Sequence, residues 1–534
     1  MSASVPVPWR SIAELAASAA EIHGERLAIS DRDTQLTYAE LFERARTCAA
    51  AFVESGVRPG DRVAIWAFNS AEWVIAYLGL ILAGATLVPI NTRFKGREAA
   101  DILLRSRARV LCTVAGFLGT DYVELLRSTA IDLPDLQTIV VLHGQTTPGA
   151  VSWSEFLARQ TDPALHEVDL RRIKVASDDI ADILFTSGTT GIPKGVMMTH
   201  AQTLHVACDY VNQTDLRSDD RYLMVNPYFH MFGLKAGILA ALASGAAMFP
   251  EPVFDVGQVL SHVQGHRISV MPGPPTLFQG ILDHPDRSRT DLSSLRMAVT
   301  GATDLPVEVM DRIFDAMPSI KILNGYGLTE AGTVAGTSPS DDADTIVNSS
   351  GHPRPGVDIR IVDEAGSDLP LESPGEIWLR SPGVMLGYLD DPSGTAATIT
   401  PDGWLKTGDL GVLDAERRLH IVGRLKDMFI VGGFNAYPAE IENLLLRHPL
   451  IAEAAVIGVP DERLGEVGFA YIRPRPGVQV EPEEIVEWAR GEMANYKVPR
   501  AVELVDALPI NATGKVQKTV LREWAADRRR GSMA

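Results

Sequence analysis

The sequence predicts an α/β protein that contains more than one domain. Its 534 residues are too many for a single hydrophobic core, so at least two domains are expected. Short apolar strands, such as residues 61–66 and 110–114, alternate with helical stretches, such as residues 38–56. This alternation indicates a parallel, doubly wound sheet with helices on its faces.

The first elements follow from local signals. Residues 27–30 favour a strand, and Asp33 and Thr34 favour a turn. Thr37 stands directly before the helical stretch 38–56. Because its hydroxyl can accept a hydrogen bond from the first turn, we expect it to be the N-cap of that helix.

The apolar stretch 73–90 approaches the length of a membrane-spanning helix, about 20 residues. It changes from helix formers to β formers around Gly84 and ends near Pro89. We therefore expect a buried helix that ends at Gly84 and a short strand at 86–88. A membrane span is the alternative, but no stable membrane insertion is expected. The next helix is expected at 98–105.

Residues 237–250 repeat this plan of apolar helix, glycine, small-residue strand and proline. Two similar α/β subdomains would explain the repeat, and convergent packing would explain it as well. From 351 to 422, short β-rich pieces between Gly, Pro and Asp turns predict a small antiparallel barrel or distorted sheet. The polar residues 423–427 then precede a new apolar run. We expect a small second domain to begin there.

Composition narrows the function classes. The net charge of −19 argues against a nucleic-acid partner, because phosphate backbones require basic patches. Cys48, Cys112 and Cys208 are scattered, which fits a reducing compartment without a disulfide framework or zinc site. The first residues lack a basic segment followed by an apolar core, so no signal peptide is expected and the predicted location is cytoplasmic.

The most informative stretch is Thr186-Ser-Gly-Thr-Thr-Gly-Ile-Pro-Lys-Gly195, which lies between two apolar runs. Glycines allow close approach of the backbone to an anion, and hydroxyls and a lysine add donors and positive charge. A mobile surface turn is the alternative. The spacing excludes a Walker-type P-loop, because Pro193 precedes Lys194 and Gly195 follows it.

Three further stretches carry polar groups suited to a nucleotide, each with a plainer alternative. In 324–330, Tyr326 could present its ring to a base, or Thr329 could only cap a following helix. In 403–409, Asp409 could accept two ribose hydroxyls or lie in an exposed turn. In 509–515, the Gly-Lys pair also fails the P-loop pattern and could be a solvated turn.

In this order and at these separations, the four stretches resemble the core motifs of the adenylate-forming superfamily. That superfamily includes acyl-CoA synthetases, aryl-CoA ligases, luciferases and amino-acid adenylation domains. The resemblance covers nearly the whole chain, residues 10–520. It implies a large N-terminal domain, residues 1–425, of two α/β subdomains plus a β-barrel. A small mobile α+β domain, residues 426–534, would follow and would carry the catalytic lysine.

The resemblance also implies a role for each stretch. The loop at Thr186 would bind the β- and γ-phosphates of ATP, Tyr326 would stack on adenine, and Asp409 and Arg424 would hold the ribose. Gly432 and Gly433 belong to a segment that would line the tunnel for coenzyme A. The implied ligand-binding residues are Thr186, Ser187, Gly188, Thr189, Thr190, Gly191, Lys194, Gly301, Ala302, Thr303, Asn324, Gly325, Tyr326, Gly327, Asp409, Arg424, Gly432 and Gly433.

The implied catalytic residues are Lys515, Thr329, Glu330 and His230. Thr329 would contact the α-phosphate, and Glu330 would be the Mg²⁺ ligand. Lys515 would reach in from the small domain, which would swing about a hinge at Lys426. The implied reaction joins a carboxylate to the α-phosphate of ATP, releases pyrophosphate, and passes the acyl group to a thiol. Because charge builds on the phosphorus, such catalysis depends mainly on positioning and electrostatic stabilisation.

The stretch around His230 (Asn226-Pro-Tyr-Phe-His-Met-Phe-Gly233) narrows the substrate. It lacks the Asp with which amino-acid adenylation domains bind an α-ammonium group, so an α-amino acid substrate is not expected. The resemblance to medium-chain and ring-acid CoA ligases implies a fatty, ring or steroid-derived acid. His230 would gate the acyl site, or be a packed histidine at a strand end. Lys235 is expected to be exposed, with contact to a polar group of the substrate as the alternative. No carrier domain follows, so CoA is the expected acceptor, with an acyl-AMP ligase serving a separate carrier protein as the alternative. A homodimer is also among the expected assemblies.

Overall fold

The computed structural model describes residues 5–186, 193–273, 275–300, 307–431, 434–461, 463–511 and 515–532. Some of the predicted ligand-binding residues lie outside these ranges, and their assignments stay predictions. They are Ser187, Gly188, Thr189, Thr190, Gly191, Gly301, Ala302, Thr303, Gly432 and Gly433.

The first subdomain is built on a nine-stranded sheet with the order β21-β10-β9-β4-β3-β5-β7-β8, and β6 pairs with β5. The strands from β9 to β8 in this order are parallel, whereas β10 runs antiparallel to β9 and β21. Its strands are β3 (Arg62–Trp66), β4 (Thr86–Pro89), β5 (Ala108–Phe117), β6 (Thr120–Asp121), β7 (Thr138–His143), β8 (Val151–Ser152), β9 (Ile180–Thr186), β10 (Lys194–Thr199) and β21 (Gly387–Tyr388).

The second subdomain has a seven-stranded sheet with the order β15-β14-β13-β11-β12-β1-β2. All neighbouring strands in this sheet are parallel except the antiparallel pair β1 and β2. Because β1 pairs with β12, the first strand of the chain belongs to the second sheet. Its strands are β1 (Leu27–Asp31), β2 (Thr34–Thr37), β11 (Arg221–Met224), β12 (Ala247–Pro250), β13 (Val270–Pro272), β14 (Met297–Val299) and β15 (Lys321–Leu323).

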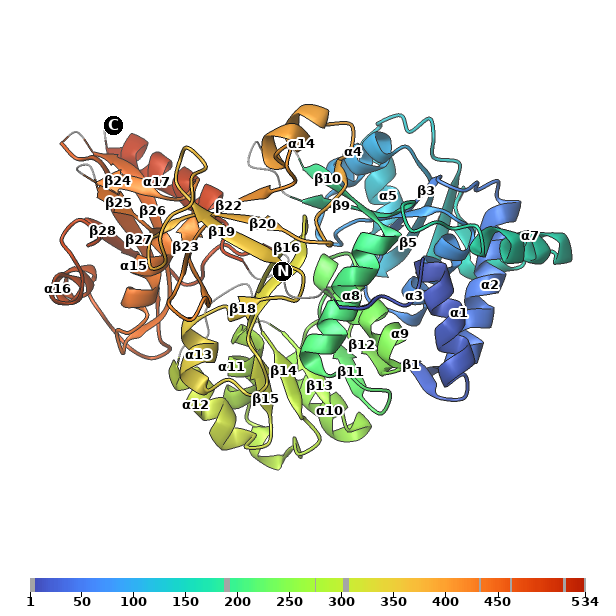
Figure 1. The fold of residues 1–534 in the computed structure, drawn as a ribbon, viewed down its shortest axis with the longest axis horizontal. Helices are drawn as coiled ribbons and strands as arrows, with labels where there is room; N and C mark the ends of the chain where they lie inside the picture. The colour runs from blue at the N-terminus through green and yellow to red at the C-terminus, as the bar shows by residue number, and fades with distance from the viewer. Residues whose placement is uncertain are drawn as a thin grey trace.

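Helices cover both sheets, and α8 lies between them near the middle of the molecule (Figure 1). Most α8 residues are buried, because the helix packs against strands of one sheet and against η1 and α9 of the other. The helices before residue 320 are α1 (Ile12–His23), α2 (Tyr38–Glu54), α3 (Ala71–Leu82), α4 (Gly96–Ser106), α5 (Tyr122–Arg127), α6 (Trp153–Leu157), α7 (Asp162–Arg172), α8 (His200–Thr214), the π-helix η1 (Phe232–Leu239), α9 (Ala240–Ser244), α10 (Val256–His266), α11 (Pro275–Asp283), the 3₁₀ helix η2 (Arg287–Arg289) and α12 (Val307–Ala316).

Local signals placed these elements well. Thr37 caps α2 in a full capping box with Glu40, as predicted. The apolar stretch 73–90 divides into α3 and β4, and Gly84 takes the left-handed conformation between them. Gly245 does the same between α9 and β12, so the internal repeat corresponds to equivalent units of the two subdomains. Within the described residues, no helix is long and apolar enough to cross a lipid bilayer.

Two antiparallel sheets follow. One lies mostly before the predicted stretch 351–422 and is a three-stranded ribbon of β16 (Gly325–Leu328), β17 (Gly332–Gly336) and β18 (His352–Pro353). The other has the order β19 (Asp358–Val362), β20 (Gly375–Arg380), β22 (Leu405–Leu413) and β23 (Leu419–Arg424). Helices α13 (Ala343–Asn348) and α14 (Pro392–Thr398) lie in their connections.

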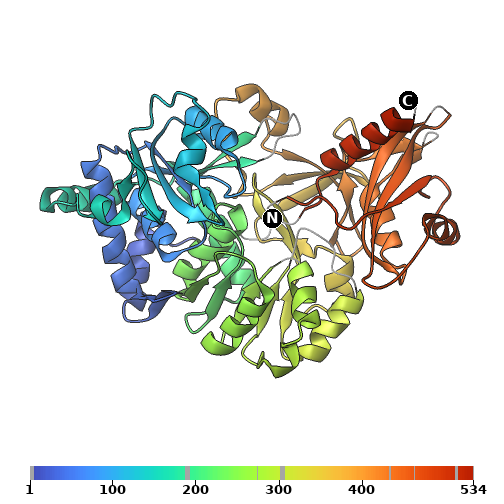
Figure 2. The same cartoon turned by 180° about the vertical axis from the view of Figure 1, so that it is seen from behind.

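The C-terminal segment has a core of its own. Its sheet has the order β25-β24-β27-β26, with β28 beside β27, and its buried apolar residues from Phe429 to Ala525 form a separate cluster. Most of this segment lies away from the first subdomain, with the antiparallel sheets between them (Figure 2). Its elements are β24 (Phe429–Val431), β25 (Phe434–Ala436), α15 (Pro438–Leu445), β26 (Ile451–Asp461), β27 (Gly465–Pro474), α16 (Pro482–Glu492), β28 (Ala501–Leu504) and α17 (Lys518–Ser532).

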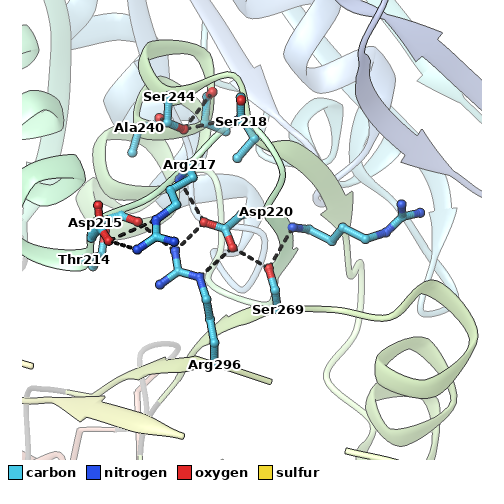
Figure 3. A network of polar contacts seen from close by, with 12 residues as sticks. Thr214, Asp215, Arg217, Ser218, Asp220, Ala240, Ser244, Ser269 and Arg296 are labelled. Atoms are coloured by element: carbon cyan, nitrogen blue, oxygen red, sulfur yellow. Dashed lines mark hydrogen bonds and ion pairs between the residues drawn. The ribbon is translucent and has the colours of Figure 1, made fainter. Parts of the chain in front are cut away.

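A polar network connects the N-terminal ends of strands in the second sheet (Figure 3). Asp220, directly before β11, is 3% exposed and accepts hydrogen bonds from the Arg217 amide (2.8 Å), Ser269 Oγ (2.7 Å) and Arg296 Nε (2.8 Å). Ser269 and Arg296 precede β13 and β14, so one carboxylate joins the starts of three parallel strands. The opposite, C-terminal edge of such a sheet is where ligands bind in α/β folds.

Candidate active site

The predicted ribose-binding residues meet at one corner of the antiparallel sheets. Asp409 on β22 and Arg424 on β23 are register partners, and Arg424 Nε lies 3.0 Å from Asp409 Oδ1. Tyr326 on β16 donates its hydroxyl to Asp409 Oδ2 at 2.6 Å. Asp409 is only 7% exposed, so a carboxylate is held at this corner by a cation and a phenol from two other strands.

Asn324 shapes the turn that presents Tyr326. Its side-chain Nδ2 donates to the carbonyls of Ile346 (3.2 Å) and Ser349 (3.1 Å), and its Oδ1 accepts from the Gly325 amide at 2.9 Å. The side chain is therefore engaged by the protein backbone, and it orders the loop between β15 and β16. A Cβ on Gly327 would lie 2.6 Å from the Gly332 carbonyl oxygen, so the close β16–β17 hairpin requires glycine there.

Glu330 follows this hairpin strand and lies among buried polar groups. Tyr388 on β21 donates its hydroxyl to Glu330 Oε1 at 3.1 Å. Burial raises the pKa of the Glu330 carboxyl above its ordinary value, because the charged form loses solvation. The alternative that Thr329 caps a following helix is wrong, since the next element is the strand β17.

The predicted phosphate loop joins β9 to β10, as expected for a loop between two buried strands. Thr186 and Lys194 are paired in the antiparallel ladder at its base. Lys194 Nζ lies 4.5 Å from the centre of the Tyr388 ring, so Tyr388 contacts both Lys194 and Glu330. Arg105 Nη1 donates to the Pro193 carbonyl at 2.6 Å and holds the end of the loop.

His230 lies in a tight turn between β11 and η1. Its amide donates to the Pro227 carbonyl at 3.0 Å, and its Nδ1 accepts a hydrogen bond from the Phe232 amide at 3.2 Å. Burial, followed by the nearby positive charge of Lys515, lowers the pKa of His230 to about 4. The ring is therefore neutral at pH 7, and with Nδ1 accepting, its proton is on Nε2.

Lys515 of the C-terminal segment is close enough to this site to interact electrostatically with three of its residues. Its charge lowers the pKa of His230. The pKa of Lys515 is itself lowered, first by desolvation and then by Arg424, while Asp409 opposes the shift. The Lys515 amide also donates to Asn511 Oδ1 at 2.9 Å, and Arg93 of the first subdomain contacts the Asn511 carbonyl at 3.4 Å. The structure thus brings Lys515 toward the site formed by the preceding domain.

Three buried residues contradict or extend the predictions from the sequence. Lys235, expected to be exposed, is 0% exposed, and its Nζ lies 3.1 Å from Asp182 Oδ1 on β9. The expectation failed because an acidic partner from the other sheet accompanies the lysine into the core. Asp182 was missed, although an acidic residue in the apolar run 180–185 could have signalled a buried partner. Tyr388 was missed as well, and nothing in its local sequence marks it.

Comparisons with known proteins agree with this arrangement. The family model described as "AMP-binding enzyme" matches residues 16–389, and "AMP-binding enzyme C-terminal domain" matches residues 440–515. The chain is similar to the anthranilate CoA ligase AuaEII, solved in complex with anthranoyl-AMP, with a TM-score of 0.87, 30% identity and coverage of 97% of this chain and 98% of that one.

Two relatives share the name 3-[(3aS,4S,7aS)-7a-methyl-1,5-dioxo-octahydro-1H-inden-4-yl]propanoyl:CoA ligase. The relative from Rhodococcus jostii (strain RHA1) is 48% identical over 95% of this chain and 97% of its own length. The one from Mycobacterium tuberculosis (strain ATCC 25618 / H37Rv) is 46% identical over 93% of this chain and 96% of its own length.

These matches confirm the predicted superfamily and its division into a large N-terminal and a small C-terminal part. Matches to the family model and to relatives named as CoA ligases also confirm the predicted class of enzyme, and they favour CoA over a carrier protein. The chain therefore belongs to the AMP-binding enzyme family and is an AMP-forming acid–CoA ligase.

Proposed function

We propose that this enzyme joins CoA to a propanoate side chain on a fused, two-ring diketone, the acid that names its two relatives. The observation that carries this proposal is their 46–48% identity over at least 93% of the chain. The side chains around His230 suit a compact ring acid. Tyr228 is buried, Phe232 and Met231 are apolar, and the stretch 226–233 contains no Asp or Glu that could repel an acid or bind an amine.

The nucleotide would bind along the corner formed by Tyr326, Asp409 and Arg424. Asp409 would exchange its contact with the Tyr326 hydroxyl for hydrogen bonds from the ribose. The Tyr326 ring would then be free to stack on adenine. Lys194, beside the phosphate loop, would supply a positive charge to the β- and γ-phosphates.

Glu330 is the residue that we propose to hold Mg²⁺. Within the described parts of the chain, no group of three His, Cys, Asp or Glu side chains is arranged to bind a metal ion. A single carboxylate still fits Mg²⁺, which commonly takes one or two protein carboxylates and completes its shell with substrate phosphates and water. The bound ion would neutralise phosphate charge, and its positive charge would return the Glu330 pKa toward its ordinary range.

Lys515 would stabilise the charge that develops when a substrate carboxylate oxygen attacks the α-phosphorus and pyrophosphate leaves. We further propose that residues 426–534 swing about Lys426 after this step, so that the CoA thiol can attack the acyl carbon and release AMP. The separate core of that segment supports this movement. Asp427, next to the hinge, is tied to Arg522 of α17 at 2.8 Å, so this end of the hinge would move with the small domain.

The direct test is CoA-dependent AMP release with a panel of fatty, aromatic and ring-propanoate acids. The proposal requires the largest kcat/KM for the two-ring propanoate, and a clear preference for a straight-chain acid would refute it. Pyrophosphate exchange that depends on the acid but is followed by no thioester would favour the carrier-protein alternative. A cytoplasmic location and a homodimer are proposed as well, to be tested by cell fractionation and light scattering.

A further inference from the structure

The turn that carries His230 is attached to the other subdomain through the buried side-chain amide of Asn69. Asn69 follows β3 of the nine-stranded sheet and is 4% exposed. Its Nδ2 donates to the Met224 carbonyl (3.0 Å) and the Asn226 carbonyl (2.9 Å), and its Oδ1 accepts from the Tyr228 amide (2.8 Å). Both amide hydrogens and the carbonyl oxygen of one side chain therefore hold the strand exit that leads to His230.

The turn itself leaves little freedom for movement. His230 donates to the Pro227 carbonyl, and a Cβ on Gly233 would lie 2.2 Å from that same carbonyl oxygen. Pro227 and Gly233 are thus in close contact, and His230 lies at the tip of the turn between them. Since Asn69 contacts the residues on both sides of Pro227, its position sets where the tip points.

The other end of the turn is also held from the nine-stranded sheet. Lys235 in the π-helix η1 forms its buried ion pair with Asp182 on β9, and Thr203 Oγ1 donates to Asp182 Oδ2 at 2.6 Å. π-helical turns are rare and occur frequently at functional sites. His230 therefore lies between two buried polar attachments that both come from the first subdomain. The strand that leads into its turn, β11, belongs to the second subdomain.

We propose that Asn69 is a positioning residue for the acyl site. It holds the turn of His230 so that the Nε2–H of His230 faces the carboxylate of the substrate. The Asp182–Lys235 pair fixes the position of the following helix, η1. The position of the turn before that helix then depends on Asn69. The inference rests on the proposed function and on the expected place of His230 at the acyl site. No group of Asn69 itself needs to touch the substrate.

The test is a double-mutant cycle with Asn69→Leu and His230→Ala, measured with the best acid found. We expect Asn69→Leu to lower kcat/KM for the acid by about 10- to 100-fold, since a misplacement near 1 Å can cost on the order of 100-fold. KM for ATP should change by less than about twofold, because the nucleotide corner is untouched. In the His230→Ala background, Asn69→Leu should cost less than about threefold.

Thr113→Val is the matched control. Thr113 is 0% exposed and donates to the Trp66 carbonyl at 3.0 Å in the same sheet, so the variant loses a buried hydrogen bond without touching the His230 turn. It should leave the kinetic constants for the acid within about twofold of the parent. If Asn69→Leu does not yield folded protein, Asn69→Ser takes its place in the cycle.

The result that overturns the inference is an equal loss from the Asn69 variant with and without His230, because the two residues would then act independently. A crystal structure of the Asn69 variant is a second test, and it does not depend on ligase activity. Displacement of residues 226–233 with Tyr326 and Asp409 unmoved supports the inference, and an unchanged turn overturns it. Absence of any acid activation by the parent enzyme would instead refute the proposed function.

Discussion

The buried pair of Lys235 and Asp182 gives the sharpest stability prediction. Both side chains are fully buried, 3.1 Å apart, and Thr203 supplies the one other hydrogen bond to the carboxylate that the described residues show. Lys235→Met keeps a flexible apolar side chain of similar length but leaves the Asp182 charge uncompensated. Removing one partner of a buried pair costs about 3–5 kcal/mol, a large fraction of a typical stability of about 5–15 kcal/mol.

Replacing both partners should reverse most of that loss. In the double variant Asp182→Leu/Lys235→Met neither charge of the pair remains in the core, and such replacements range from neutral to stabilising by about 1–4 kcal/mol. The Thr203 hydroxyl would lose its acceptor, at about 1 kcal/mol. We therefore expect the double variant to lie within about 2 kcal/mol of the parent, and so to be more stable than the single variant.

The assay is urea unfolding followed by tryptophan fluorescence, with the transition of the N-terminal domain fitted separately, since a two-domain chain need not unfold in one step. Asp182→Leu alone serves as the reciprocal variant, and it should also destabilise strongly because it leaves the lysine unpaired. A single Lys235→Met variant that loses less than about 1 kcal/mol would refute the reasoning. A double variant no more stable than the single one would refute it as well.

Three further predictions concern other parts of the molecule. Lys515→Ala should lower acid-dependent pyrophosphate exchange by at least about 100-fold yet largely spare thioester formation from supplied acyl-adenylate; equal loss in both would contradict the proposed domain movement. Burial alone would raise the pKa of Asp220, but hydrogen bonds from Arg296 and Ser269 outweigh it and hold the pKa below 3.8. The stabilisation by ionised Asp220 is thus present above pH 3.8 and is lost as pH falls through the folded pKa. Asp220→Asn should therefore lower the free energy of unfolding by about 2 kcal/mol near pH 7. The unfolding curves of the variant and the parent should converge as the pH is lowered. The hydrogen bond from His262 to buried Glu251 raises the His262 pKa above 6.5, although burial opposes it. This contribution is complete below pH 6.5 and is lost as pH rises through the folded pKa, so His262→Gln should be destabilising in acid and nearly neutral at pH 9; a pH-independent loss would show that the ion pair is not responsible.

Much of the local structure could be predicted because it depends on neighbouring residues. The capping box at Thr37, the glycine ends of the apolar helices, and the loop between the two strands around 186–195 are set within a few positions of the chain. The family resemblance worked for a related reason, since contacts to a nucleotide need particular residue types at particular turns. The pairing of Asp409 with Arg424 followed from that resemblance and agrees with their register in the sheet.

The residues that were not predicted depend instead on partners far away in the sequence. Lys235 was expected at the surface because nothing near it in the sequence could neutralise it, and its partner lies 53 positions earlier, in the other sheet. Tyr388, which contacts both Glu330 and Lys194, has no local signal of its own. Asn69 looks like an ordinary turn residue until the two sheets are packed together.

The sequence by itself therefore determined the class of fold and the family, because short-range spacing and residue chemistry carry that information. Tertiary structure alone decided which buried charges are paired, how His230 is protonated, and which residues hold it in place. Those properties depend on desolvation and on contacts between sheets. Both arise only when segments far apart in the chain are packed together.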